Sequence, residues 1–186
     1  MSIPKDDHER AQDIDIPRML GIYLNDHLAG ATAGWELARR AAREHRQSPL
    51  GGELEDLAVQ ILEDRKALLA VMADLEVPVR RYKVYGGWLG EKAGRLKPNG
   101  RLRRRSGLSS VVELESLRIG VEGKALLWHS LLAAAGQDIR LDSDRLTELL
   151  NRAWRQRAAL ESLHDTAAAT MFAPGRPEPR EAVVGP

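Results

Sequence analysis

The chain lacks several features on which whole classes of protein depend. It contains no cysteine, which excludes disulfide bonds and thiolate metal sites and is typical of a reducing compartment. No uninterrupted apolar run approaches the roughly 20 residues that a transmembrane helix needs. Residues 1–15 are polar and lack the apolar stretch of a secretion signal. The sequence therefore predicts a cytoplasmic protein with no transmembrane segment.

Motifs of the common catalytic sites are also missing. The chain has no Gly-x-Ser-x-Gly elbow, no Walker loop and no Gly-x-Gly-x-x-Gly motif after a strand. Aromatic residues make up only 4% of the 186 residues, whereas hydrophobic residues make up 43%, and Ala, Leu, Arg and Glu dominate. This composition indicates one helical domain with a core of its own, and nothing in it assembles a nucleophile with its base.

Four long stretches carry apolar residues at the 3-and-4 spacing of an amphipathic helix. They predict helices over residues 17–46, 50–75, 110–135 and 143–172. Pro17 suits the first turn of the first helix, and Ser110 with Glu113 reads as a capping box that starts the third. We expect an all-α four-helix bundle of two hairpins over residues 17–172, between a flexible N-terminus (1–16) and a disordered tail (173–186).

The connection between the hairpins, residues 78–109, is too long for a simple turn. A short helix interrupted by Gly86 is expected within it, and the connection either crosses the bundle from end to end or stays at one end. Residues 80–105 hold ten Lys or Arg and one acidic residue, a charge of +9, whereas the rest of the chain carries −8.

This basic segment has two interpretations. It lies as a strap over the acidic helices of its own bundle, or it binds an anionic partner such as nucleic acid, a membrane surface or an acidic protein. The candidate anion-binding residues are Arg80, Arg81, Lys83, Arg101, Arg103, Arg104 and Arg105.

Several polar residues fall on or beside the apolar stripes, where an unpaired charge is costly. Counting outward from the turn near Ile139 places Glu122 level with Arg157 and Glu115 level with His164. These residues therefore have two interpretations, a metal site or three ion pairs. The ion pairs are Glu122 with Arg157, Glu115 with His164, and His27 with Asp64.

Glu161-Ser162-Leu163-His164 is a Glu-x-x-His motif, which places a carboxylate and an imidazole on adjacent turns. In this motif and in its helix pattern the chain resembles the ferritin-like superfamily. The resemblance implies a ferritin-like four-helix bundle with a divalent metal (iron, manganese or zinc) held by Glu115, Glu161 and His164. The first helix has no glutamate on its core face, where the family has one, and His27 on that stripe is the fourth candidate ligand. The second helix, however, reads Glu63-Asp64-Arg65-Lys66, with lysine where the family has histidine.

Two functional hypotheses follow from these observations. The first is a non-enzymatic ferritin-like bundle that acts through its basic segment or as a homodimer, with Trp35 and Trp154 as candidate interface residues. The alternative is a degenerate metal-binding bundle that keeps half of a ferritin-like site.

Overall fold

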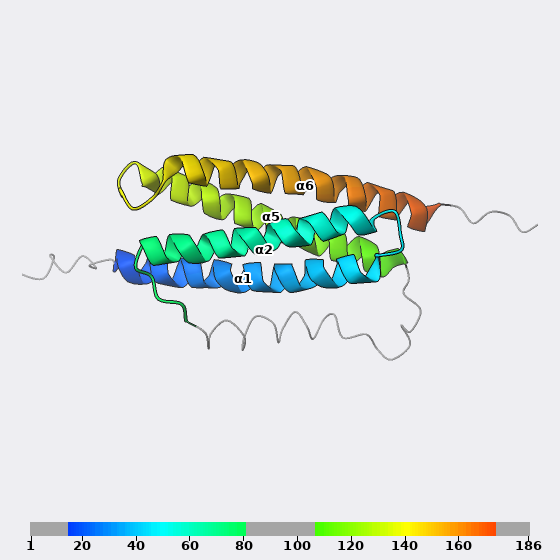
Figure 1. The fold of residues 1–186 in the computed structure, drawn as a ribbon, viewed down its shortest axis with the longest axis horizontal. Coiled ribbons are helices and arrows are strands. Elements are labelled where there is room, and N and C mark those ends of the chain that lie inside the picture. Colours follow the sequence, from blue (N-terminus) through cyan, green and yellow to red (C-terminus); the bar gives the residue numbers. More distant parts are fainter. Residues whose placement is uncertain (1–14, 81–106, 174–186) are drawn as a thin grey trace, which may run out of the picture.

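The computed structural model of the chain describes residues 15–80 and 107–173. This part contains four α-helices and no strand: α1 (Ile16–Glu44), α2 (Gly51–Asp74), α5 (Gly107–Ala135) and α6 (Ser143–Phe172) (Figure 1). The prediction of an all-α chain is confirmed. None of these four helices is both long enough and apolar enough to span a bilayer. Most of the predicted connection with its short helix (78–109) and of the predicted terminal tails (1–16 and 173–186) lies outside the described residues. Ile16, predicted in the flexible N-terminus, is the first residue of α1.

Two of the helix starts are fixed by side-chain caps. The carboxylate of Asp15 accepts a hydrogen bond of 3.0 Å from the backbone N–H of Arg18, and a proline occupies the first turn of α1. Asp142 accepts bonds of 3.0 Å from the N–H groups of Asp144 and Arg145 at the start of α6. Both starts agree with the sequence prediction.

The predicted capping box at Ser110 is wrong. Helix α5 begins at Gly107, three residues earlier, so that Ser110 lies inside the helix. Its hydroxyl lies 3.0 Å from Nε2 of His45, the residue that follows α1. Ser110 therefore connects α5 to the end of α1 and does not cap the start of α5.

The helices form two antiparallel hairpins that lie side by side (Figure 1). The carbonyl of Pro78 and the N–H of Arg80 bond to the side chain of Asn25, near the start of α1. The start of α5, by contrast, contacts His45 at the far end of α1. Helices α2 and α5 therefore run in the same direction, and Arg80 and Ser110 lie toward opposite ends of α1.

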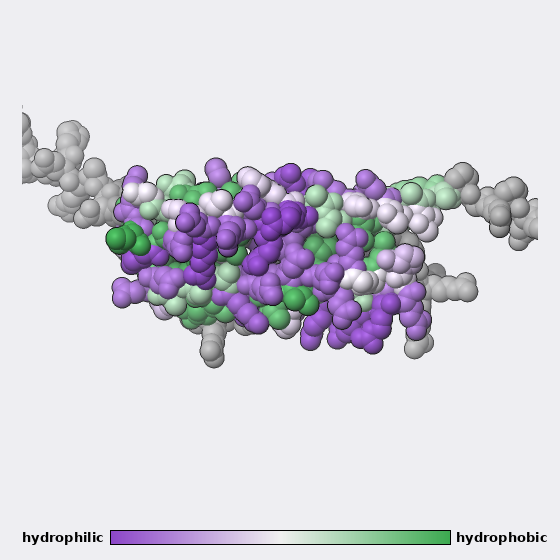
Figure 2. Space-filling view, turned by 45° about the horizontal axis from the view of Figure 1, so that its top comes forward, coloured by the Kyte–Doolittle hydropathy of each residue, from purple (hydrophilic) through white to green (hydrophobic). Residues whose placement is uncertain are grey.

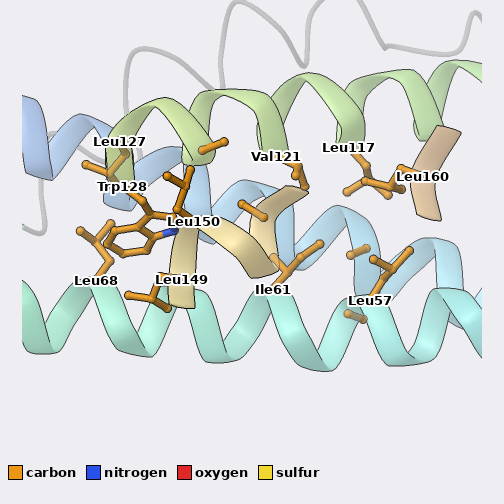
Figure 3. Packing of buried hydrophobic residues seen from close by; sticks show 14 of the residues in the cluster. Leu57, Ile61, Leu68, Leu117, Val121, Leu127, Trp128, Leu149, Leu150 and Leu160 are labelled. Carbon is orange, nitrogen blue, oxygen red and sulfur yellow. The ribbon is translucent and has the colours of Figure 1, made fainter. Parts of the chain in front are cut away.

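All four helices contribute apolar side chains to one core (Figure 3). Trp128 on α5 is almost wholly buried and lies among Leu68 of α2 and Leu149 and Leu150 of α6. Burial of such side chains removes apolar surface from water, which is the main favourable contribution to folding.

The two hairpins meet along two lines of contact, which we call the α1–α5 seam and the α2–α6 seam. The α1–α5 seam is the more extensive of the two. Helices α2 and α6 contact each other much less, and the surface above them is mostly hydrophilic (Figure 2). This second seam contains the polar residues described next.

Candidate functional site

A network of charged and amide side chains lies inside the bundle, centred on Asp64 of α2. Its carboxylate is only 1% exposed and accepts hydrogen bonds from the Nζ of Lys124 (2.5 Å), the Nε of Arg152 (2.7 Å) and the amide of Gln156 (3.0 Å). Gln156 in turn accepts from Lys124 and donates to Gln60 at 3.2 Å. The network thus joins α2, α5 and α6 through one carboxylate.

The helix periodicity accounts for these positions. Each buried polar residue takes a place in the 3-and-4 spacing of its own apolar stripe. The stripes read Ile61–Asp64–Leu68 on α2, Val121–Lys124–Trp128 on α5 and Ala153–Gln156–Leu160 on α6. Packing of the apolar residues on either side therefore carries the polar residue into the interior.

Burial lowers the pKa of the Lys124 ammonium, and the charge and hydrogen bond of Asp64 oppose this effect. Arg152 adds a second positive charge on the other carboxylate oxygen and also reaches Glu63 at 3.4 Å. The interior carboxylate is therefore already matched by two cations. A divalent metal ion at Asp64 would have to displace an ammonium group beside a guanidinium group, which like-charge repulsion opposes.

Arg152 also reaches the surface, where it helps to line a shallow groove of about 550 Å³ along α2 and α6. The groove carries two further arginines, Arg145 and Arg155, together with Glu148. Arg145 is engaged by Asp74 at 3.4 Å. The groove thus mixes both signs of charge, and we assign it no ligand.

Two of the three predicted ion pairs are confirmed. Nε2 of His164 lies 3.3 Å from Oε1 of Glu115, and Arg157 lies 3.4 Å from Glu122. Both pairs lie at the partly exposed edge between α5 and α6, so solvent weakens them. The predicted pair of His27 with Asp64 is wrong, because Asp64 is held by the network above.

The four predicted metal ligands do not come together. Glu161 is bound by Arg118 at 2.7 and 2.9 Å, although it lies one turn from His164. His27 packs edge-to-face against Tyr23, with ring centroids 4.6 Å apart. In residues 15–80 and 107–173, no group of three or more His, Asp or Glu side chains could hold a metal ion.

The position of His27 along the bundle explains its separation from the others. Arg40 contacts Glu113 across the antiparallel α1–α5 seam, which sets the register of these helices. His27 then lies level with Leu126, roughly 16 Å along the axis from Glu115 at 1.5 Å per residue. Burial lowers the pKa of His27, with Asp26 acting in the opposite direction.

The sequence analysis missed Lys124, Arg152 and Gln156. It placed Arg157 and His164 on the buried stripe of α6, but the buried residues are their neighbours Gln156 and Leu163. An error of one residue turns the predicted face by about 100°. The position of Lys124 between Val121 and Trp128 was a signal that could have identified it.

Of the predicted anion-binding residues, only Arg80 belongs to the described part, where its backbone N–H binds Asn25 at 2.7 Å. Arg81, Lys83, Arg101, Arg103, Arg104 and Arg105 lie outside it. Of the two predicted interface tryptophans, Trp154 is exposed, whereas Trp35 is partly buried beneath the guanidinium of Arg39 at 5.1 Å.

The chain was compared with models of protein families, with curated proteins and with solved structures. None of them matches. A functional assignment therefore rests on the residues and geometry described above.

Proposed function

We propose that this chain is a non-enzymatic, ferritin-like helical bundle that acts through its surface, with its basic segment (residues 80–105) binding an anionic partner. The observation that carries the proposal is the network around Asp64. A metalloenzyme of this architecture keeps its interior carboxylates free to bind a metal ion. In this bundle, Lys124 and Arg152 bind the interior carboxylate of Asp64 instead. The interior carboxylate is thus occupied by the chain's own cations, and recognition is left to the surface.

The directions of the helices support the ferritin-like part of this proposal. Bundles of that kind join two antiparallel hairpins by one long connection, so that the second and third long helices are parallel. Helices α2 and α5 have this relation, with Arg80 and Ser110 anchored at opposite ends of α1.

The charge distribution supports the partner class. A charge of +9 within residues 80–105 and −8 elsewhere gives the chain a localised positive region. Tyr82, Tyr85 and Trp88 interleave with these charges and offer aromatic faces on which bases stack. Nucleic acid is therefore the first anionic partner to test.

The test is a salt-titrated binding measurement with fluorescent duplex DNA, single-stranded RNA and anionic vesicles. Replacing Arg103, Arg104 and Arg105 by alanine should weaken binding to duplex DNA and reduce the slope of log K against log salt by up to about 2.7. A matched control replaces three exposed arginines of the first hairpin, Arg18, Arg43 and Arg46.

The outcome separates the partner classes. Binding to vesicles but not to nucleic acid would move the assignment to a membrane surface. If the unmodified chain binds neither nucleic acid nor anionic vesicles at low salt, the proposal is wrong for both kinds of partner. If the control variant loses as much affinity as the Arg103, Arg104 and Arg105 variant, the loss reflects only the change in net charge.

The Glu115–His164 pair favours a second candidate, a degenerate metal-binding bundle. Glu161 lies on the adjacent turn and would complete a three-residue site if it left Arg118. Elemental analysis of protein purified without a histidine tag decides between the candidates. Stoichiometric iron, manganese or zinc that disappears in His164→Ala would favour the metal site, and trace metal only would leave the scaffold.

A further inference from the structure

Helix α5 carries a second apolar stripe on the side away from the core. Its members recur at intervals of three or four residues over seven turns, and none of them is charged or buried. They are Leu108, Val112, Ser116, Ile119, Gly123, Leu126, Ser130 and Ala134. We call this set the outer stripe.

The large members of the outer stripe are exposed to an unusual degree for such residues. Ile119 is 65% exposed, Leu126 is 58% and Leu108 is 49%. The two serines are also effectively apolar, because their hydroxyls donate to the carbonyls of Val112 and Leu126 at 2.8 Å. A helix that is apolar on both sides is normally buried on both sides.

Four of the glycines inside α1 and α5 have open space beside them among the described residues: Gly30, Gly34, Gly120 and Gly123. A Cβ atom added at any of them meets no described heavy atom within 4 Å, and none has a positive φ. Glycine inside a helix is less favourable than alanine, yet no described contact requires it here. By the register of the seam, Gly30 and Gly34 lie level with Gly123 and Ile119. The described residues therefore leave this side open to another helix.

We propose that the outer stripe is the interface with a second copy of this chain, packed antiparallel about a two-fold axis at the level of Val121. In that arrangement each large side chain faces a small residue of the other copy, as an isologous contact requires. The facing pairs are Ile119 with Gly123, Leu126 with Ser116, Val112 with Ser130, and Leu108 with Ala134.

The charges that flank the outer stripe agree with the same axis. Glu122 falls near the level of Arg118 of the second copy, and the two-fold symmetry repeats this contact. Each of these residues therefore approaches an opposite charge across the interface, in addition to its partner within the chain, which is Arg157 for Glu122 and Glu161 for Arg118.

The interface accounts for several observations together. It covers an apolar stripe about 39 Å long at 1.5 Å per residue, and it explains why glycine stands where alanine would make a more stable helix. The proposed dimer develops the hypothesis that the bundle acts as a homodimer, and it involves no residue of the basic segment. A failure of anion binding would therefore leave it intact, and its own failure would leave anion binding intact.

The first experiment measures the mass of the full chain by sedimentation equilibrium over a range of concentrations. The unmodified chain should be a dimer, and Ile119→Glu and Leu126→Glu should each raise the dimer dissociation constant by about 100-fold or more, because each buries an unpaired charge. Val59→Glu on α2 is the matched control, since Val59 is similarly exposed but lies on another helix. Circular dichroism checks that each variant remains helical.

The second experiment tests the register. Gly123→Ile should abolish the dimer, because the new side chain would meet Ile119 of the second copy. The double variant Ile119→Ala with Gly123→Ile should restore it, because the large and small residues are then exchanged. An unmodified chain that stays monomeric at about 100 μM overturns the proposal and points to another occupant of the stripe, such as residues 81–106. A dimer that survives both glutamate variants overturns it as well.

Discussion

The two seams between the hairpins are built on different principles. The α1–α5 seam is the more extensive, and its polar contacts Arg40–Glu113 and His45–Ser110 lie at one end of the bundle. The α2–α6 seam is looser, and the Asp64 network lies within it. One side of the molecule is thus held mainly by apolar packing, and the other is joined by directional polar bonds, most of the buried ones to the carboxylate of Asp64.

The two seams therefore have different roles, one in the stability of the fold and the other in the alignment of the two hairpins. Apolar packing is non-directional and depends mainly on the area removed from water. A buried carboxylate, in contrast, must meet its partners at defined atoms or remain uncompensated. The α1–α5 seam should therefore contribute stability, whereas the α2–α6 seam should select one alignment of the hairpins. The four predictions below test this division.

The largest effect should follow removal of the network's only interior carboxylate. Asp64→Leu would leave Lys124 and Arg152 without their shared partner, and we expect a loss of about 3–5 kcal/mol in the free energy of unfolding, measured in urea. Asp74→Ala is the control, because its pair with Arg145 is exposed and should contribute about 1 kcal/mol or less. Equal losses in the two variants would contradict the special role of the interior.

Replacing the whole network should have the opposite sign. With Asp64→Leu, Lys124→Met, Arg152→Met and Gln156→Leu combined, the four polar side chains of the network are all removed together. None of them leaves another without its partner, and we expect stability from unchanged to about 1–4 kcal/mol higher. If the network sets the register, this variant should also show broadened NMR signals from more than one packing. Sharp single signals would show that the apolar core alone selects the alignment.

Glycine replacement tests the spare room beside the α1–α5 seam. In the Ile119→Glu background, where no dimer is expected, Gly34→Ala should stabilise the chain by about 0.5–1 kcal/mol through helix propensity. Gly51→Ala serves as the contrast, because its Cβ would come within 2.5 Å of the carbonyl oxygen of His45 and should destabilise the chain. If Gly34→Ala lowers the free energy of unfolding, a neighbouring group already fills this space.

The smallest expected effect is on the pH dependence of stability, through the side chain of His27 on α1. Burial holds the pKa of His27 below its ordinary value of 6.5, so the unfolded chain binds this proton more readily than the folded one. The contribution of His27 to stability should therefore be constant above pH 6.5 and fall as the pH drops below it. His27→Gln should unfold with a shallower acid dependence than the unmodified chain, and identical profiles would contradict the assignment.

Much of the fold followed from the sequence. The 3-and-4 spacing of apolar residues placed all four long helices within a few residues of their observed bounds, and Asp15 and Asp142 marked two starts correctly. These features are local, because helix periodicity and capping involve residues within one or two turns of each other. Counting residues from a short turn also predicted the Glu115–His164 and Glu122–Arg157 pairs.

Only the tertiary structure decided which polar residues are buried and what they bind. The sequence marked Asp64 as an interior residue but paired it with His27, and it overlooked Lys124 and Gln156. Long-range partners depend on the rotation of each helix about its axis, and a shift of one residue, as on α6, exchanges Gln156 for Arg157. The periodicity of apolar residues determines where a helix forms, but it is too coarse to determine the rotation of that helix about its axis. The sequence pattern therefore specified a bundle of four helices, and only tertiary packing specified the interior ion network.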